Sequence, residues 1–229
     1  SNAYPGPLDS DAVQIHEAHL EVNRELARTP AALRPQACME GLRFVRQWIQ
    51  ARAPGRKLVT ITLRQYEFLT LRNSNTEAWV AFAKELTRDG YFPVIVPDTV
   101  TALDPPPLEF SGIAIFPEAA HNILLRMALY ELAYLNFATT GGPAALLLLS
   151  ERCRFLLLKL LIPEVPLCSA EHLAKSGLTI GLDPTFLSVT QHIVWEHDDL
   201  PIIRREFDAM VAKIEGDTLP ASASPTVVD

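Results

Sequence analysis

Cysteine is scarce in this chain of 229 residues. The three cysteines are Cys38, Cys153 and Cys168, and no two of them have CxxC spacing. An odd number of cysteines in a chain of this length is typical of reduced thiols in a cytosol-like compartment. We therefore expect a cytoplasmic protein without a disulfide framework.

Positive charge is also in short supply. The chain has 20 Lys and Arg against 27 Asp and Glu, which gives a formal net charge of -7. A general nucleic-acid-binding protein is usually basic, so we expect no nucleic-acid partner. The balance does not exclude one anionic ligand in a local basic pocket.

Long uninterrupted apolar runs are missing. The most apolar stretch, residues 143–162, is interrupted by Ser150, Glu151, Arg152, Arg154 and Lys159. So many polar groups argue against a membrane span. We expect a helix that ends near Glu151, followed by a buried strand over residues 155–161.

Several catalytic signatures are absent. The chain has no GxSxG elbow, no GxGxxG or Walker loop, and no visible Ser-His-Asp or Cys-His arrangement. His16 and His19 lie three residues apart, but no third ligand is evident, so we expect no metal site. We also expect no cofactor, and the sequence assigns no catalytic residue.

Apolar, β-branched segments alternate with amphipathic ones after Lys57. Strands are predicted over residues 58–63, 92–96, 112–116, 134–138, 155–161 and 191–195, and helices over 76–89, 118–133 and from 200 onward. Residues 134–138 could instead continue the preceding helix. This rhythm fits right-handed parallel crossovers. It predicts an α/β fold with a doubly wound, mostly parallel, Rossmann-like sheet flanked by helices.

The two ends of the chain have a different pattern. Residues 1–56 predict an N-terminal helical segment, which either packs on the α/β domain of residues 57–215 or bridges it to another domain. Residues 1–3 are typical of a cleaved tag, and no methionine follows them. We therefore expect a longer natural chain, from which an N-terminal domain could be missing. Residues 216–229 are rich in Ser, Pro and Thr and predict a disordered tail.

The loop after the first predicted strand is the first candidate site. In an open parallel sheet, ligands bind beyond the carboxyl ends of the strands. Arg64 and Arg72 could neutralise a diphosphate and bind its oxygens in bidentate fashion. Asn73, Ser74 or Asn75 then begins a helix whose free N–H groups favour anions. Alternatively, these polar residues only cap the helix and the arginines are solvated. We favour capping for the polar residues and ligand binding for Arg64.

The loop after the fourth predicted strand is the second candidate. It consists of Thr139, Thr140, Gly141, Gly142 and Pro143. The glycines would let the backbone approach a ligand closely, and the following helix could bind a phosphate at its N-terminus with help from the threonine hydroxyls. Alternatively, the glycines serve a tight turn that requires positive φ. The shared sheet edge with Arg64 favours ligand binding.

Two further places could supply an acid or a base. Residues 196–199, after the last predicted strand, contain three carboxylates. We favour a structural role for them, because carboxylates are stabilising at the start of a helix. His121 could point into a cleft from its helix or lie on the surface.

Three stretches together resemble the C-terminal, nucleotide-sugar-binding half of two-domain GT-B glycosyltransferases, over residues 57–214. They are Arg64 with residues 72–75, the turn at residues 140–143, and the strand and helix start at residues 191–199. The resemblance implies a nucleoside-diphosphate-sugar partner and no metal requirement. It also implies that Arg64, Arg72, Thr140, Gly141 and Gly142 bind the donor phosphates. It does not specify a sugar.

The chain departs from the GT-B pattern at its N-terminus. GT-B enzymes carry the acceptor site, and often the catalytic base, in an N-terminal Rossmann domain, whereas only two predicted helices precede the first strand here. Either that domain was removed or lies on another chain, or the protein is a non-catalytic relative. An acidic residue for the ribose is not identifiable. A nucleotide-binding or interaction module, or another doubly wound enzyme, remains an alternative.

Overall fold

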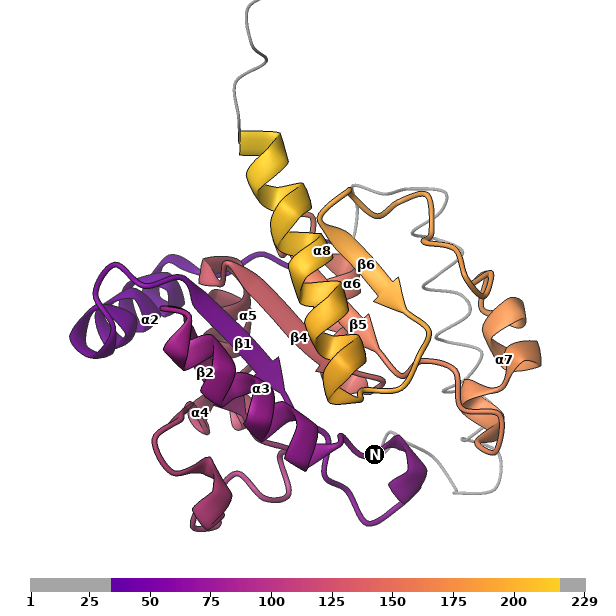
Figure 1. Cartoon of the computed structure of the whole chain (residues 1–229), viewed down its shortest axis with the longest axis horizontal. Coiled ribbons are helices and arrows are strands. Elements are labelled where there is room, and N and C mark those ends of the chain that lie inside the picture. The colour runs from indigo at the N-terminus through magenta and orange to yellow at the C-terminus, as the bar shows by residue number, and fades with distance from the viewer. Residues whose placement is uncertain (1–33, 219–229) are drawn as a thin grey trace, which may run out of the picture.

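Six strands form the centre of the molecule in a computed structural model that describes residues 34–218 (Figure 1). The strands are β1 Leu58–Thr62, β2 Phe92–Val96, β3 Ala114–Ile115, β4 Leu135–Thr139, β5 Phe155–Leu158 and β6 Gln191–Val194. Their order in the sheet is β3-β2-β1-β4-β5-β6, and every neighbouring pair is parallel. The predicted α/β fold is confirmed, and the sheet is parallel throughout rather than mostly parallel.

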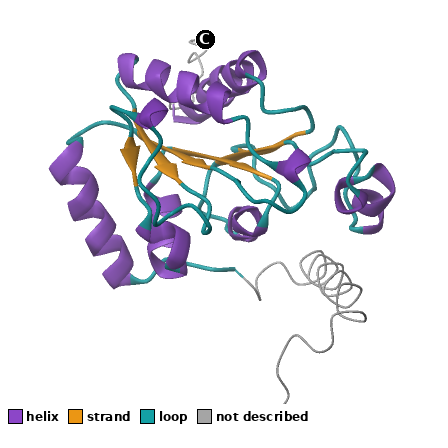
Figure 2. Cartoon of the chain, turned by 90° about the horizontal axis from the view of Figure 1, so that it is seen from below, coloured by secondary structure: helices purple, strands orange, loops and turns teal. Residues whose placement is uncertain are grey.

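Helices cover both faces of this sheet (Figure 2). They are α2 Met39–Arg52, α3 Thr76–Arg88, α4 Glu118–His121, α5 Ile123–Leu132, α6 Gly142–Leu149, α7 Ala170–Lys175 and α8 Leu200–Thr218. Short 3-10 turns lie at Thr70–Arg72, Leu108–Phe110 and Pro166–Cys168. Among these helices, none is both long and apolar enough to cross a bilayer.

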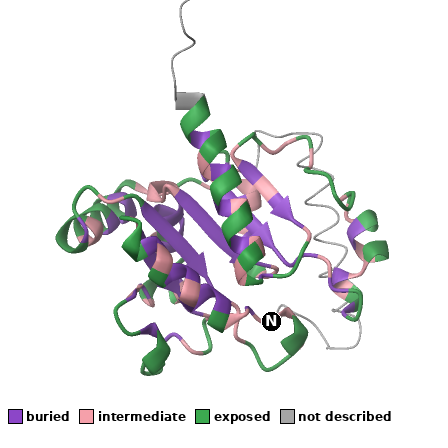
Figure 3. Ribbon diagram, in the orientation of Figure 1, coloured by how far each residue is buried: buried purple, intermediate pink, exposed green. Residues whose placement is uncertain are grey.

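Successive strand residues point to opposite faces, which divides the core into two layers. On one face α3 and α8 pack on the sheet, and the ring of Phe137 lies 5.3 Å from Trp79 and 5.4 Å from Phe82 between centroids. On the other face Leu42 and Val45 of α2 pack with β2 and α5. The strands β1, β2, β4 and β5 are therefore buried on both sides (Figure 3). The second predicted helix, now α2, packs on the α/β domain.

Some predicted boundaries were wrong. The helix expected over residues 118–133 is divided at Asn122, whose side-chain oxygen accepts hydrogen bonds from the backbone N–H groups of Leu124 and Leu125 at 2.9 and 3.1 Å. The backbone of Asn122 is extended there, so α4 ends and α5 begins. Residues 135–139 form β4, so the alternative of a continued helix is excluded.

Other predictions fall at or beyond the described residues. The helix α8 runs to Thr218, so the tail expected from residue 216 does not begin there. Its remaining residues, 219–229, lie outside the described part, as do the first predicted helix and His16 and His19.

Candidate functional site

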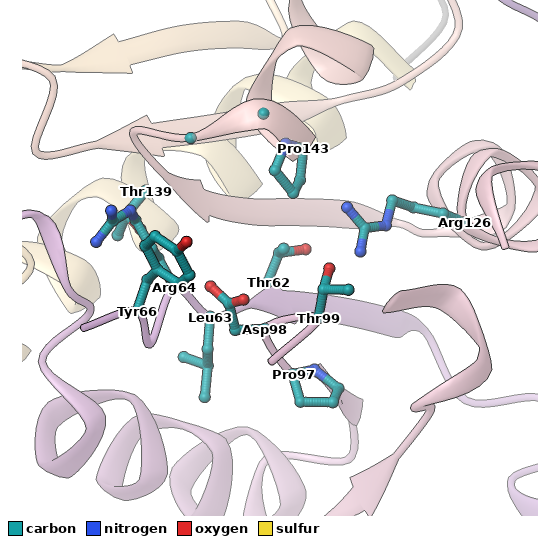
Figure 4. A pocket seen from close by; sticks show the side chains of 12 residues that line it. Thr62, Leu63, Arg64, Tyr66, Pro97, Asp98, Thr99, Arg126, Thr139 and Pro143 are labelled. Carbon is teal, nitrogen blue, oxygen red and sulfur yellow. The ribbon is translucent and has the colours of Figure 1, made fainter. Parts of the chain in front are cut away.

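The chain leaves β1 and β4 toward opposite faces of the sheet. After β1 it enters α3, which packs on the face of Phe137, and after β4 it enters α6, which packs on the face of the next residue, Ala138. Loops that diverge in this way open a crevice at the carboxyl edge, where doubly wound proteins bind ligands. A pocket of about 230 Å³ lies there, lined from the ends of β1, β2 and β4 (Figure 4).

Arg64 borders the pocket and also holds its own loop together. Its guanidinium donates to the carbonyl oxygens of Phe68 and Leu69 at 3.0 and 3.3 Å, and to the side-chain oxygen of Asn73. Burial lowers the pKa of Arg64, and the neighbouring charge of Arg72 lowers it further. The guanidinium nevertheless stays charged at neutral pH. Arg64 therefore has a structural role whether or not it binds a ligand.

Arg72 lies beside the glycine turn but does not line the pocket. Its Nη2 lies 3.5 Å from the carbonyl oxygen and 3.4 Å from the hydroxyl of Thr140. Its buried Nε has no hydrogen-bond partner among residues 34–218. The structure thus brings the two predicted loops together, with Arg72 as a direct link.

The asparagines of the first loop bond within the protein. The side-chain oxygen of Asn73 accepts from the guanidinium of Arg64 and from the backbone N–H of Tyr66 at 3.1 Å. Asn75 caps α3 by accepting from the N–H of Ala78 at 3.3 Å. The capping interpretation of Asn75 agrees with this geometry.

A buried ion pair lies behind this loop, and no sequence pattern indicates it. The ammonium of Lys159 is 3.3 Å from Oδ1 of Asp198 and donates to the carbonyl of Asn73 at 2.6 Å. Oδ2 of Asp198 accepts from the backbone N–H of Asn75 at 2.7 Å and from the indole N–H of Trp79 at 2.8 Å. Asp198 is therefore a buried acceptor that connects Lys159 to the start of α3, and its role is not merely that of a carboxylate at the start of α8.

The glycine turn after β4 has an unexpected backbone. Gly141 is extended, with φ 174° and ψ 175°, and neither Gly141 nor Gly142 lies in the left-handed region of positive φ that favours glycine. The alternative that these glycines serve a positive-φ turn is therefore wrong. A Cβ at Gly142 would meet no heavy atom within 4 Å, and one at Gly141 would lie no closer than 3.7 Å to any. Apart from the N-cap position of Gly141 and the proline after Gly142, nothing in the described chain accounts for glycine at either position.

Two charged residues of the pocket were not found from the sequence. Arg126 of α5 is only 8% exposed, and its guanidinium donates to the carbonyls of Ala119 and Ala120 at 2.6 and 3.2 Å. Asp98 follows β2 and accepts from the backbone N–H groups of Gln65 and Val100 at 3.0 and 3.2 Å. The strand-end rule could have indicated Asp98. His121 is exposed at the end of α4, not at a helix start, and does not line the pocket.

Two of the hydroxyl groups of the pocket come from strand ends. Thr62 at the end of β1 shares a hydrogen bond of 2.8 Å with the phenol of Tyr130, and burial raises the pKa of that phenol. Thr139 ends β4, and its hydroxyl lies 3.2 Å from that of Ser74. Within residues 34–218, no group of three or more His, Cys, Asp or Glu could hold a metal ion. The pocket therefore offers cations, hydroxyls and one carboxylate.

Comparison with known proteins bears on this arrangement. No family model and no curated protein matches the chain. ADP-heptose lps heptosyltransferase II from E. coli matches with a TM-score of 0.51 at 12% identity, over 80% of this chain and 54% of that chain. The chain has a glycosyltransferase-like fold. A glycosyl transferase family 9 structure from Veillonella parvula has a TM-score of 0.48 at 11% identity, over 82% and 47% of the two chains.

At 12% identity the likeness establishes the fold alone. The chain spans about half the length of the heptosyltransferase that it matches. The pocket and its residues come from the geometry described above, and a doubly wound fold hosts many chemistries. A function must therefore be argued from the site.

Proposed function

We propose that residues 57–215 form the donor-binding half of a GT-B-type glycosyltransferase, which takes a nucleoside-diphosphate sugar in the crevice between β1 and β4. The observation that carries the proposal is the turn at Gly141 and Gly142. Neither glycine has a φ in the left-handed region, and a Cβ at either position would be crowded by no atom beyond its chain neighbours. Close approach of a ligand to the backbone is a physical reason for two consecutive residues without side chains at this turn.

The surroundings of the turn suit a diphosphate. The helix α6 begins at this turn with no side-chain cap and with proline in its first turn, so its N-terminal N–H groups favour an anion. Thr139 and Thr140 add hydroxyls beside it, and Arg64 and Arg72 add positive charge from the facing loop. These groups would stabilise the diphosphate as it leaves, without a metal ion.

Asn73 and Asn75 take a supporting place in this proposal. Their bonds to Arg64, Tyr66 and Ala78 hold the first loop beside the turn, so they orient the arginines and do not contact the donor. The acceptor site and the catalytic base would lie on a second domain, in a longer natural chain or on a partner chain. The fold shared with about half of a heptosyltransferase supports such a division. We place the protein in the cytoplasm, where nucleotide sugars would be available to it.

Thermal unfolding with a panel of nucleoside diphosphates and sugar nucleotides tests the proposal. A ligand at one hundred times its Kd should stabilise the fold by about 2.7 kcal/mol. The variant Gly142→Val should still fold without ligand, because its Cβ meets no atom beyond its chain neighbours within 4 Å, and the valine before Pro143 should lower the unfolding temperature only modestly. It should lose the response to the ligand.

The control must be another glycine at which a side chain is tolerated. Gly177 is unsuitable, because its φ of 79° would strain any other residue at that position. Gly216→Ala is suitable, since a Cβ there also meets nothing within 4 Å and the residue lies far along α8 from the pocket. It should keep the full ligand response. If no panel member stabilises either this chain or the full-length natural protein, the proposal is wrong.

A further inference from the structure

Arg126 carries a charge that the described chain does not compensate. No carboxylate forms an ion pair with it among residues 34–218, and its hydrogen bonds use Nε and Nη2 on two carbonyl groups. Its Nη1 makes no hydrogen bond there and keeps some access to solvent, although the residue as a whole is 8% exposed. Buried charges are normally paired. Because the guanidinium faces the pocket, an anionic ligand group is the partner that this position suits (Figure 4).

Asp98 brings the opposite charge to the same pocket without neutralising Arg126. Each of its carboxylate oxygens accepts one backbone N–H, and no ion pair with Arg126 is formed in the described part. An ionised carboxylate has about four acceptor positions, so lone pairs remain for hydroxyl donors. A ligand with a negative group at one end and hydroxyls at the other would satisfy both side chains.

We propose that Arg126 and Asp98 form a subsite for a phosphorylated polyol, with the phosphoryl group on Arg126 and a hydroxyl donating to Asp98. The guanidinium suits a phosphoryl group because it can donate from more than one nitrogen. Thr62 and Thr99 line the pocket beside them and can exchange hydrogen bonds with further hydroxyls. A volume of about 230 Å³ is below that of most whole-ligand sites, so the subsite holds one part of a larger ligand.

This inference deepens the proposed function, since a sugar nucleotide contains phosphorylated polyol units. A purely structural role of Arg126 is the competing explanation. Through Ala119 and Ala120, Arg126 joins the end of α4 to α5, and that role alone would account for its burial. If Arg126 has only this structural role, its loss lowers the stability of the protein and leaves ligand binding unchanged.

NMR titrations of the labelled protein with ribose 5-phosphate and methyl phosphate separate the two. Both probes carry a phosphoryl group, but only ribose 5-phosphate carries hydroxyls. Arg126→Gln should weaken both probes by about tenfold or more, as expected for a lost hydrogen bond between charged groups. Asp98→Asn should weaken ribose 5-phosphate by about tenfold and leave methyl phosphate within about twofold. Arg43→Gln, at an exposed residue of α2, should change neither.

The spectrum without ligand shows in the same experiment whether each variant is folded. If Arg126→Gln does not fold, Arg126→Lys takes its place and should weaken both probes while keeping the charge. A folded Arg126 variant that binds both probes like the wild type overturns the subsite. So does a wild type that binds neither probe.

The subsite and the proposed function fail in different ways. If ribose 5-phosphate binds through Arg126 but no sugar nucleotide binds, the subsite stands and the glycosyltransferase proposal falls. If a sugar nucleotide binds through the glycine turn and Arg126→Gln leaves its affinity unchanged, the subsite falls and the glycosyltransferase proposal stands.

Discussion

The buried pair of Lys159 and Asp198 allows a sharp test of what holds the site in place. Asp198 is 1% exposed and Lys159 is 9% exposed. The substitution Asp198→Ala removes the carboxylate but leaves the ammonium inside the protein. It also leaves the indole N–H of Trp79 and the backbone N–H of Asn75 without their acceptor. Three donors, two at the start of α3 and one after β5, lose one common partner.

The expected loss of stability follows from these contacts. Removing one member of a buried ion pair costs about 3–5 kcal/mol, because the remaining charge is uncompensated. Lys159 keeps its hydrogen bond to the carbonyl of Asn73, which favours the lower end of that range. The adjacent Asp199→Ala is the matched control. Asp199 is exposed, and its carboxylate accepts one hydrogen bond of 3.2 Å from Asn75, so we expect a loss below about 1 kcal/mol.

Urea unfolding followed by tryptophan fluorescence measures both free energies. The double variant Lys159→Met with Asp198→Ala should be more stable than Asp198→Ala alone, because it no longer contains a buried unpaired charge. A loss of less than about 1 kcal/mol for Asp198→Ala would refute the reasoning. Strict additivity of the two single substitutions would refute it as well, since it would mean that the pair does not interact.

Three other perturbations probe the fold directly. Phe137→Ala should lower the free energy of unfolding, measured in urea, by about 3–5 kcal/mol, because this fully buried ring packs against three other aromatic rings. A loss under about 1 kcal/mol would contradict that packing. Asn122→Ala should cost about 1 kcal/mol in the same assay, and Asn122→Asp should cost less because it keeps the α5 cap. Burial raises the pKa of the Cys153 thiol from 9.0 to about 11. The stability that this thiol contributes should therefore be full below pH 9 and fall by at most about 3 kcal/mol as the pH rises to 11. Unfolding midpoints that decline equally in Cys153→Ala would disprove this.

The sheet could be predicted because its strands are marked locally. Parallel strands that are buried on both faces read as short apolar runs, and residues 58–62 and 92–96 are of this kind. Their carboxyl ends then place Arg64 and the glycine turn at one edge. The end of β5 could not be predicted in this way. Lys159 adopts a φ of 59°, so the strand stops at Leu158, although apolar residues continue to Ile162.

The charged residues of the site were harder to predict because sequence gives position but not partners. Asp198 and Asp199 are identical neighbours, yet the first is buried among three donors and the second is exposed. Arg126 stands in an apolar helix, where a single arginine is compatible with a surface position or with an interior one. Only the three-dimensional arrangement shows that it faces a pocket and has no carboxylate beside it in the described chain.

The structure also changes which residue is the better probe of ligand binding. From the sequence, Arg64 is the natural choice, but its guanidinium holds three acceptors of its own loop. Loss of binding in Arg64→Ala would therefore not distinguish a lost ligand contact from a displaced loop. Gly142 has no such internal partners, and a side chain there fills only open space. An effect of Gly142→Val on ligand binding, with stability unchanged, therefore points to the space that a ligand would occupy.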